Sequence, residues 1–206
     1  MVRVKVCGIT NREDALKISK MGVDAIGFIL SSKSQRMVSL SKVSEIVKIL
    51  PPFLSRVAVV VDPTIEQLNE IENSKFFDYI QFHGSESIDL IKRSKLKTIK
   101  AIKIENEQSL KAISTYEEDV DYFLFDTKVG EKVGGTGKTF DWGFLKQINL
   151  QKPFILAGGI GPNNVIEAIK EVKPDAIDLN SKVEEKPGKK DIKLIKEVLS
   201  KIKREE

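Results

Sequence analysis

The sequence predicts a single-domain α/β fold, a (β/α)8 barrel that occupies residues 1–206. Short apolar runs alternate with longer segments of helical period, and the alternation continues through eight units. Several runs, such as VAVVV at 57–61 and YFLF at 122–125, are almost wholly apolar, as strands buried on both faces require. The length suits this fold, because such barrels begin at about 200 residues, and no linker rich in Pro, Gly or Ser divides the chain.

Eight parallel strands are expected, joined by right-handed crossovers through helices. The strands lie at 3–7, 25–30, 56–61, 79–82, 98–102, 122–125, 154–157 and 176–179. The helices lie at 11–21, 39–50, 64–71, 86–93, 108–114, 141–147, 163–170 and 191–203. Asn11 is a candidate N-cap of the first helix. Eight units favour closure into a TIM barrel, whereas five or six would favour an open sheet.

Charge and composition limit the classes of ligand, cofactor and location that the chain can have. The 34 basic and 30 acidic residues are interspersed and give a net charge of +4, which suits an anionic small molecule and is modest for a nucleic-acid partner. One cysteine and one histidine exclude disulfides and most metal sites, so we expect no metal and no cofactor. The first residues do not show the pattern of a signal peptide, and no aliphatic run is long enough to span a membrane. We expect a cytoplasmic protein. The outer helix faces are mixed, so the sequence does not settle the oligomeric state and leaves a homodimer as one option.

Polar side chains at the strand ends are the candidate functional groups, because the active sites of such barrels lie in the loops after the strands. Cys7 follows the first strand, Arg36 lies in the loop after the second, His83 follows the fourth and Asp126 the sixth. Each has an ordinary alternative: a core cysteine, a solvated loop, a structural histidine, and a carboxylate that pairs with Lys128. The functional interpretation is an acid–base pair of Cys7 and Asp126, with Arg36 as a clamp for a carboxylate.

Glycines mark two further loops. Gly158 and Gly159 follow the seventh strand and open the next helix, so their N–H groups form a candidate phosphate site with Asn180 and Ser181 after the eighth strand. The loop at 133–139, VGGTGKT, ends like a nucleotide-binding P-loop, but lysine stands where that motif needs its first glycine. A long loop with several glycines is typical of a lid.

Six ordered motifs resemble phosphoribosylanthranilate isomerase, an enzyme family of tryptophan biosynthesis. They are KVCGIT, KSQR, QFHG, FDTK with GGTGKTFDW, LAGGIGPNNV and DLNSKVEEKPGKKD, and they cover nearly the whole chain. The resemblance implies an Amadori rearrangement of N-(5-phosphoribosyl)anthranilate to 1-(o-carboxyphenylamino)-1-deoxyribulose 5-phosphate, without metal or cofactor. Asp126 would protonate the ring oxygen of the sugar, and Cys7 would remove the proton from the adjacent sugar carbon.

The resemblance also implies roles for other residues. Arg36 would grip the anthranilate carboxylate. The remaining substrate contacts would be Gly158, Gly159, Asn180 and Ser181 at the phosphate, Gly134 and Gly135 in the closing loop, and His83 and Asp178 along the pocket. For Cys7 to act as the base, the pKa of its thiol must fall from about 8.5 toward neutrality.

Two departures from the family pattern and two rival functions stay open. Lys182 stands where the family commonly has glycine, and the loop at 31–36 lacks an aromatic–proline pair often seen there. One rival is another sugar-phosphate isomerase or epimerase, although the sequence lacks the several histidines of a metal-dependent epimerase. The other is a non-catalytic barrel that binds a phosphorylated metabolite, because binding needs only the phosphate loops and Arg36.

Overall fold

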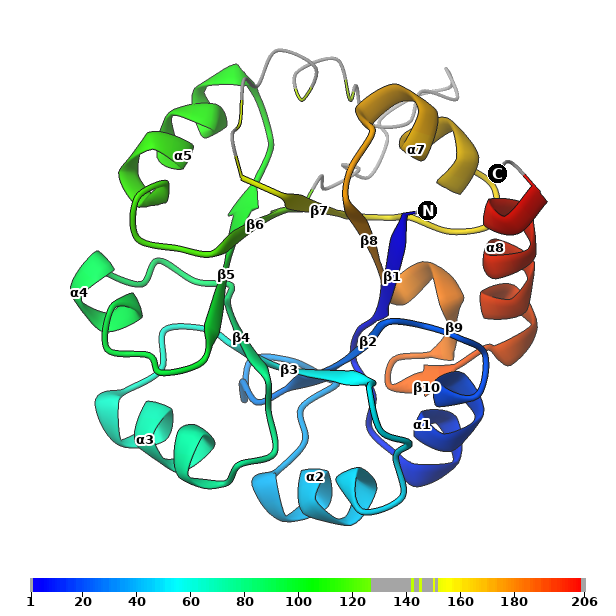
Figure 1. Cartoon of the computed structure of the whole chain (residues 1–206), viewed down its shortest axis with the longest axis horizontal. Helices are drawn as coiled ribbons and strands as arrows, with labels where there is room; N and C mark the ends of the chain where they lie inside the picture. Colours follow the sequence, from blue (N-terminus) through cyan, green and yellow to red (C-terminus); the bar gives the residue numbers. More distant parts are fainter. Residues whose placement is uncertain (1, 127–141, 143–144, 146–149, 151, 205–206) are drawn as a thin grey trace.

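The computed structural model describes residues 2–126, 142, 145, 150 and 152–204, in which eight parallel strands close into a barrel. The strands follow one another around the barrel in chain order, with the helices outside them (Figure 1). Their bounds are β1 Arg3–Val6, β2 Ala25–Ile29, β3 Ser55–Val60, β4 Tyr79–Phe82, β5 Lys97–Lys103, β6 Tyr122–Asp126, β7 Phe154–Ala157 and β8 Ala176–Leu179. The predicted fold is confirmed.

The described helices surround the barrel close to their expected positions. They are α1 Arg12–Ser19, α2 Leu40–Val47, α3 Ile65–Asn73, α4 Ile88–Ile91, α5 Lys111–Tyr116, α7 Val165–Val172 and α8 Ile192–Arg204, with a 3-10 turn, η1 Glu107–Leu110, ahead of α5. The side chain of Asn11 accepts a hydrogen bond from the N–H of Asp14, which confirms the predicted N-cap of α1. The helix predicted at 141–147 lies, apart from residues 142 and 145, outside the described residues. None of the described helices combines the length and the apolar character needed to cross a membrane.

A short antiparallel hairpin, for which the sequence pattern gave no signal, follows β8. After the 3-10 turn η2 Ser181–Val183, strand β9 Glu184–Lys186 pairs with β10 Lys189–Lys190. The buried side chain of Asp14 on α1 accepts hydrogen bonds from the backbone N–H of Lys190 at 2.9 Å and from Nζ of Lys189 at 3.1 Å. These contacts fasten the hairpin to α1. Strands this short have no usable alternation, so periodicity could not reveal them.

Alternate residues of each strand point into the barrel. The inner apolar cluster contains Cys7, Val57, Val59, Ile99, Ala101, Leu124 and Ala157, while the residues between them pack outward under the helices. Lys5 and Gln81 interrupt this apolar interior although both are buried. Lys5 stands two residues before Cys7, and Gln81 two residues before His83, so each faces the same interior as its partner. The polar part of the barrel core therefore lies directly beneath the candidate site.

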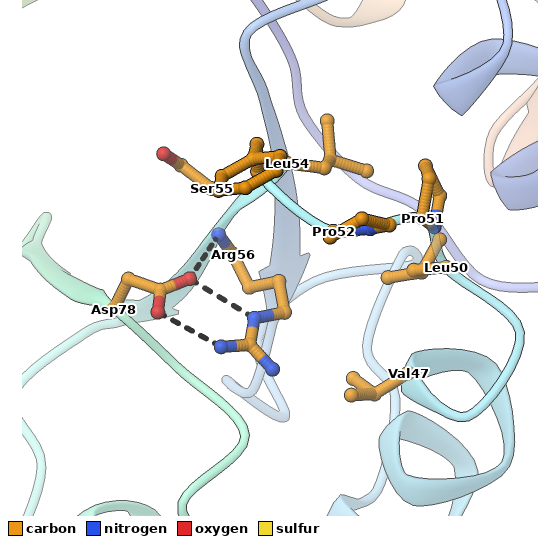
Figure 2. A pocket seen from close by; sticks show the side chains of 9 residues that line it. Val47, Leu50, Pro51, Pro52, Leu54, Ser55, Arg56 and Asp78 are labelled. Carbon is orange, nitrogen blue, oxygen red and sulfur yellow. Dashed lines mark hydrogen bonds and ion pairs between the residues drawn. The ribbon is translucent and has the colours of Figure 1, made fainter.

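The opposite end of the barrel, where the strands begin, also carries a hollow. Figure 2 shows Arg56 and Asp78 at this hollow of about 530 Å³, beside Pro51 and Pro52. The guanidinium of Arg56 donates to both oxygens of Asp78, at 2.8 and 2.9 Å. None of the candidate site residues lines this hollow, so it lies at the other end of the barrel from the candidate site.

Candidate active site

Cys7 and Asp126 lie at the same end of the barrel, on different strands. Cys7 is the first residue after β1 and is 3% exposed, whereas Asp126 closes β6 and its side chain is 24% exposed. Cys7 fits because Gly27 of β2 has no side chain: a Cβ there would lie 2.8 Å from Sγ of Cys7 and 3.2 Å from Cε of Lys5. The predicted base is therefore covered and closely packed, and the predicted acid is open to an incoming molecule.

A chain of polar side chains crosses the barrel from β8 to β6. Nζ of Lys5 donates to Oδ2 of Asp178 at 2.7 Å and to Oε1 of Gln81 at 2.8 Å. Nε2 of Gln81 lies 3.1 Å from Nδ1 of His83. Nε2 of His83 lies 3.3 Å from Oδ2 of Asp126. The structure thus brings three predicted site residues into one network, joined by two residues that sequence reasoning had not singled out.

The surroundings of Cys7 disfavour its ionised form in the free protein. Burial raises the pKa of its thiol; the charges of Lys5 and Lys190 oppose this rise, and the charge of Asp178 adds to it. The fall in pKa that Cys7 needs in order to act as the base is therefore not present in the free protein, because loss of hydration outweighs the nearby cations. Lys5 itself stays charged: burial disfavours its ammonium, but Asp178 and Cys7 outweigh that cost and raise its pKa.

Arg36 forms a bidentate ion pair with Glu184 of the hairpin. Nε of Arg36 donates to Oε1 at 2.9 Å and Nη2 donates to Oε2 at 2.7 Å. Nζ of Lys190 donates to the same carboxylate at 2.8 Å and to Oδ1 of Asn180 at 2.9 Å. Two cations around one carboxylate leave this cluster with a net positive charge. Within the described residues no hydrogen bond involves Nη1 of Arg36, so one edge of its fork is open to an anion.

The glycine loop between β7 and α7 is held by an asparagine side chain. Gly158 and Gly159 have φ angles of 91° and 66°, which residues with a side chain rarely adopt. Oδ1 of Asn164 accepts a hydrogen bond from the N–H of Gly161 at 2.9 Å, and Nδ2 of Asn164 donates to the carbonyl of Gly159 at 3.1 Å. The loop therefore keeps a fixed turn at the N-terminus of α7, where the helix dipole favours an anion.

The loop after β8 packs directly against this glycine loop. A Cβ on Gly161 would lie 2.9 Å from Cβ of Lys182, whose side chain is exposed. The first carbons of the Lys182 side chain therefore pack against Gly161, and lysine fits where the family commonly has glycine. Ser181 is exposed at the start of η2, whereas the amide oxygen of Asn180 is turned to Lys190. Gly134 and Gly135, predicted in the closing loop, lie outside the described residues.

Sequence reasoning missed five polar residues that organise the site. Lys5 and Gln81 carried a usable signal, because polar residues at inward positions of otherwise apolar strands need a partner. Asn164 also carried one, because Asn directly before a helix often binds free backbone groups. Glu184 and Lys190 carried none, since their hairpin has no periodic pattern and Arg36, the partner of Glu184, is 148 residues away.

The barrel and its mouth define the class of protein: a (β/α)8-barrel enzyme with carboxyl, thiol and cationic groups gathered at the C-terminal ends of its strands. Within the described residues, His, Cys, Asp and Glu form no group of three or more that could hold a metal ion. The family model of N-(5'-phosphoribosyl)anthranilate (PRA) isomerase matches residues 4–201. The chain belongs to this family.

Named relatives and solved structures agree with this assignment. The N-(5'-phosphoribosyl)anthranilate isomerase of Petrotoga mobilis is 66% identical over 202 residues, which make up 98% of this chain and 97% of the relative. Phosphoribosyl anthranilate isomerase from Thermotoga maritima has a TM-score of 0.90 at 40% identity, covering 99% of this chain and 100% of its own.

Two further solved structures bear on ligand and assembly. Phosphoribosyl anthranilate isomerase in complex with reduced 1-(o-carboxyphenylamino)-1-deoxyribulose 5-phosphate has a TM-score of 0.85 at 36% identity, with coverage of 99% and 100%. Monomers made from dimeric phosphoribosylanthranilate isomerase of Thermotoga maritima have a TM-score of 0.83 at 33% identity, with coverage of 98% and 99%. The resemblance drawn from the six motifs is confirmed.

Proposed function

We propose that this chain is an isomerase of tryptophan biosynthesis that converts N-(5-phosphoribosyl)anthranilate into 1-(o-carboxyphenylamino)-1-deoxyribulose 5-phosphate. The observation that carries the proposal is the mouth of the barrel, where the thiol of Cys7 packs beside Lys5 and a polar network runs from Lys5 to the carboxyl group of Asp126. Family membership and the complex of a related isomerase with a reduced form of this product support the substrate. A single catalytic domain over residues 1–206 and a cytoplasmic location stay predictions of the sequence.

The reaction needs two proton transfers at neighbouring atoms. Asp126, in its protonated form, donates a proton to the furanose ring oxygen, and the bond from that oxygen to the anomeric carbon breaks. The lone pair of the anthranilate nitrogen then forms a protonated imine. Cys7, as thiolate, removes the proton from the adjacent sugar carbon, and the electron pair of that C–H bond moves to give a neutral enolamine. Tautomerisation of the enolamine gives the ketone.

Formation of the imine explains how a buried thiol can serve as the base. In the free protein the raised pKa keeps Cys7 protonated. A positive imine beside the thiol favours its charged form, as Lys5 and Lys190 already do, and this attraction is strong where water is excluded. The proton of the thiol is released to solvent, so the thiolate forms when the positively charged intermediate is in place.

Two side chains are assigned to recognition of the substrate. Arg36 binds the anthranilate carboxylate through the edge of its fork that Glu184 leaves open, and the net positive charge of their cluster favours that anion. Asp178 binds a sugar hydroxyl: its Oδ1 is buried without a hydrogen-bond partner in the described part of the chain, and such an oxygen is costly until a donor arrives.

The phosphate is assigned to the adjoining loops after β7 and β8. Gly158, Gly159 and Ser181 lie at the ends of these loops, in the usual phosphate position of such barrels. Asn180 precedes Ser181 in the loop after β8 and stays assigned to the phosphate, with its side-chain oxygen accepting a hydrogen bond from Lys190. Gly134 and Gly135 stay assigned to the closing loop by sequence alone.

A fluorescence assay that follows loss of the anthranilate-linked substrate tests the function. Purified wild-type protein treated with EDTA should turn the substrate over, because proton transfer here requires no metal. Binding of a reduced product analogue without turnover would favour the non-catalytic rival. Turnover of a different sugar phosphate, with none of this substrate, would favour the other isomerase or epimerase.

Variants of the acid and the base test their roles. Cys7→Ser and Asp126→Asn should each lower kcat by about 10²–10⁴-fold, the usual contribution of a general acid or base. The matched control is Asp121→Asn, which makes the same change just before β6, where Asp121 accepts hydrogen bonds from Thr98 at 2.8 and 3.0 Å. The control should keep its kcat. Near-normal turnover in Cys7→Ser and Asp126→Asn would remove both assignments.

We also propose that the chain forms a homodimer through the end of the barrel where the strands begin. The side chain of Phe53 is fully exposed there, on a backbone with φ of 64°. It adjoins a hollow of about 410 Å³ whose lining includes Tyr79, Ile99 and Tyr122. Exposed aromatic and apolar surface is typical of interfaces, and the dimeric relative supports a second copy as the occupant. Pairing at this end would leave the active sites open.

A further inference from the structure

The proposed reaction leaves two buried polar residues beneath the catalytic pair without a role. Lys5 and Gln81 are 3% and 1% exposed, inside a barrel that is otherwise filled mainly by apolar side chains. Burying an ammonium is costly, and apolar residues of similar size would fill the space at no such cost. We propose that Lys5 is a positioning residue for both proton transfers: its ammonium lies beside Cys7 and, through Gln81, orients His83 against Asp126. The proposal rests on the proposed roles of Cys7 and Asp126.

The acid branch is the hydrogen-bonded path from Lys5 through Gln81 and His83 to Asp126. It has only one possible direction of hydrogen bonding. An ammonium only donates, so the amide oxygen of Gln81 must face Lys5 and the amide nitrogen must face His83. The amide nitrogen also only donates, so Nδ1 of His83 accepts and the ring proton sits on Nε2. That N–H points at Oδ2 of Asp126. Lys5 therefore selects the tautomer that donates to one oxygen of Asp126, which leaves the other oxygen to face the substrate.

The base branch is the effect of Lys5 on Cys7, and it depends on packing and charge. Sγ of Cys7 and Cε of Lys5 both pack against Gly27, since a Cβ there would touch each of them. Four charged groups face the thiol from the surrounding elements: Lys5 on β1, Asp178 on β8, Lys190 on β10 and Arg36 in the loop after β2. Of the cations, Lys5 acts most strongly to lower the pKa of the thiol against the effect of burial.

A purely structural role for Lys5 predicts something different. If the ion pair with Asp178 only closed the barrel, losing it would lower stability and would leave the titration of the thiol unchanged. If Lys5 positions the catalytic groups, its loss changes the protonation of Cys7 in a fully folded protein. The titration of the thiol therefore separates the two roles.

The test uses the only cysteine in the sequence. Ultraviolet absorbance of the thiolate, with the matching Cys7→Ser protein subtracted at each pH, gives the midpoint of its ionisation without substrate or reagent. In Lys5→Met we expect this midpoint to rise by about one pH unit or more, the usual effect of a nearby opposite charge. We also expect kcat/KM at neutral pH to fall by at least about 10-fold and to recover as the pH rises through the new midpoint, because kcat/KM reports ionisation in the free enzyme.

Lys100→Met is the matched control. Lys100 is also a buried lysine in an ion pair, with Glu86 at 2.6 Å, but it lies on the outer side of the barrel wall under α5. This variant should lose stability and keep the wild-type midpoint of Cys7. An unchanged midpoint in Lys5→Met would overturn the proposal, and so would an equal rise in both variants.

Two more variants keep the test decisive if Lys5→Met does not fold. Asp178→Asn removes the nearby negative charge and should lower the midpoint of Cys7, whereas Lys5→Met should raise it. Gln81→Leu breaks only the acid branch, so it should leave the midpoint unchanged and lower kcat by about 10-fold. A rise in Asp178→Asn, or full activity in Gln81→Leu, would refute the corresponding branch. Lack of activity in the wild-type protein would instead remove the proposed function, and the thiol titration would still report on Lys5.

Discussion

Gly27→Ala is a direct probe of how the base is held. An added Cβ would lie 2.8 Å from Sγ of Cys7, 3.3 Å from Cα of Cys7 and 3.2 Å from Cε of Lys5. Two of these neighbours belong to the proposed base, and one of the two is a backbone atom that cannot easily retreat. The methyl group must therefore push the thiol away from its position at the mouth.

The size of the effect follows from the contact distances. Carbon–sulfur contacts relax to about 3.5–4.0 Å, so Sγ must move by roughly 0.7–1.2 Å. A misplacement of about 1 Å can cost roughly 10²-fold in rate, equivalent to about 2.7 kcal/mol of transition-state stabilisation. Overpacking lowers the free energy of unfolding by about 1–3 kcal/mol, which a folded domain usually survives.

The fluorescence assay gives kcat, and urea unfolding gives the stability. Gly22→Ala is the control, because Gly22 has φ of 81° with open space around it, so alanine there costs about 1–2 kcal/mol in backbone strain far from the thiol. We expect Gly22→Ala to lose stability and keep its kcat. A Gly27→Ala protein with wild-type kcat would show that the position of Cys7 is not critical, which would undermine its assignment as the base.

Three further outcomes follow from the charges and the exposed surface. Arg36→Met should raise KM about 10-fold or more with a small change in kcat, because the clamp lies away from the bonds that change; an unchanged KM would remove the carboxylate contact. Burial opposes the charge of Glu184, but its contacts with Arg36 and Lys190 outweigh burial and lower its pKa. Its stabilising effect is therefore complete above the unfolded pKa of about 4.3 and is lost as the pH falls through the lowered folded value. Glu184→Gln should accordingly be less stable than wild type by about 3 kcal/mol near pH 7, and urea unfolding should show this gap closing toward pH 3. Phe53→Asp should yield a monomer in sedimentation experiments with kcat retained, and a wild-type protein that is monomeric at high concentration would contradict the proposed dimer.

Much of the fold could be predicted from the sequence because its causes are local. Apolar runs such as 57–61 and 122–125 identify buried strands, and the segments between them carry helical period. Each strand was located to within one residue at either end. The rule that active groups follow strands then selected Cys7, Arg36, His83 and Asp126 without any structure. The hairpin of β9 and β10 was missed because two- and three-residue strands carry no period.

The partners of these side chains could not be predicted in the same way. Arg36 was predicted to clamp a carboxylate of the substrate, and the structure shows that Glu184, 148 residues away, takes one edge of its guanidinium. The role of Cys7 as base was predicted to require a lowered pKa, and its burial raises that pKa in the free protein. Burial and charge depend on neighbours from several strands, which no single segment of sequence records.

By itself, then, the sequence determined the barrel, the order of its strands and the residues that stand at their ends, because strand alternation and helical period are properties of short segments. Only the tertiary structure decided which of these residues meet. Lys5 contacts Gln81 across 76 positions and Asp178 across 173 positions of the chain. Closing the ring of strands creates those contacts, and with them the network that runs from the proposed acid to Lys5, which packs beside the proposed base.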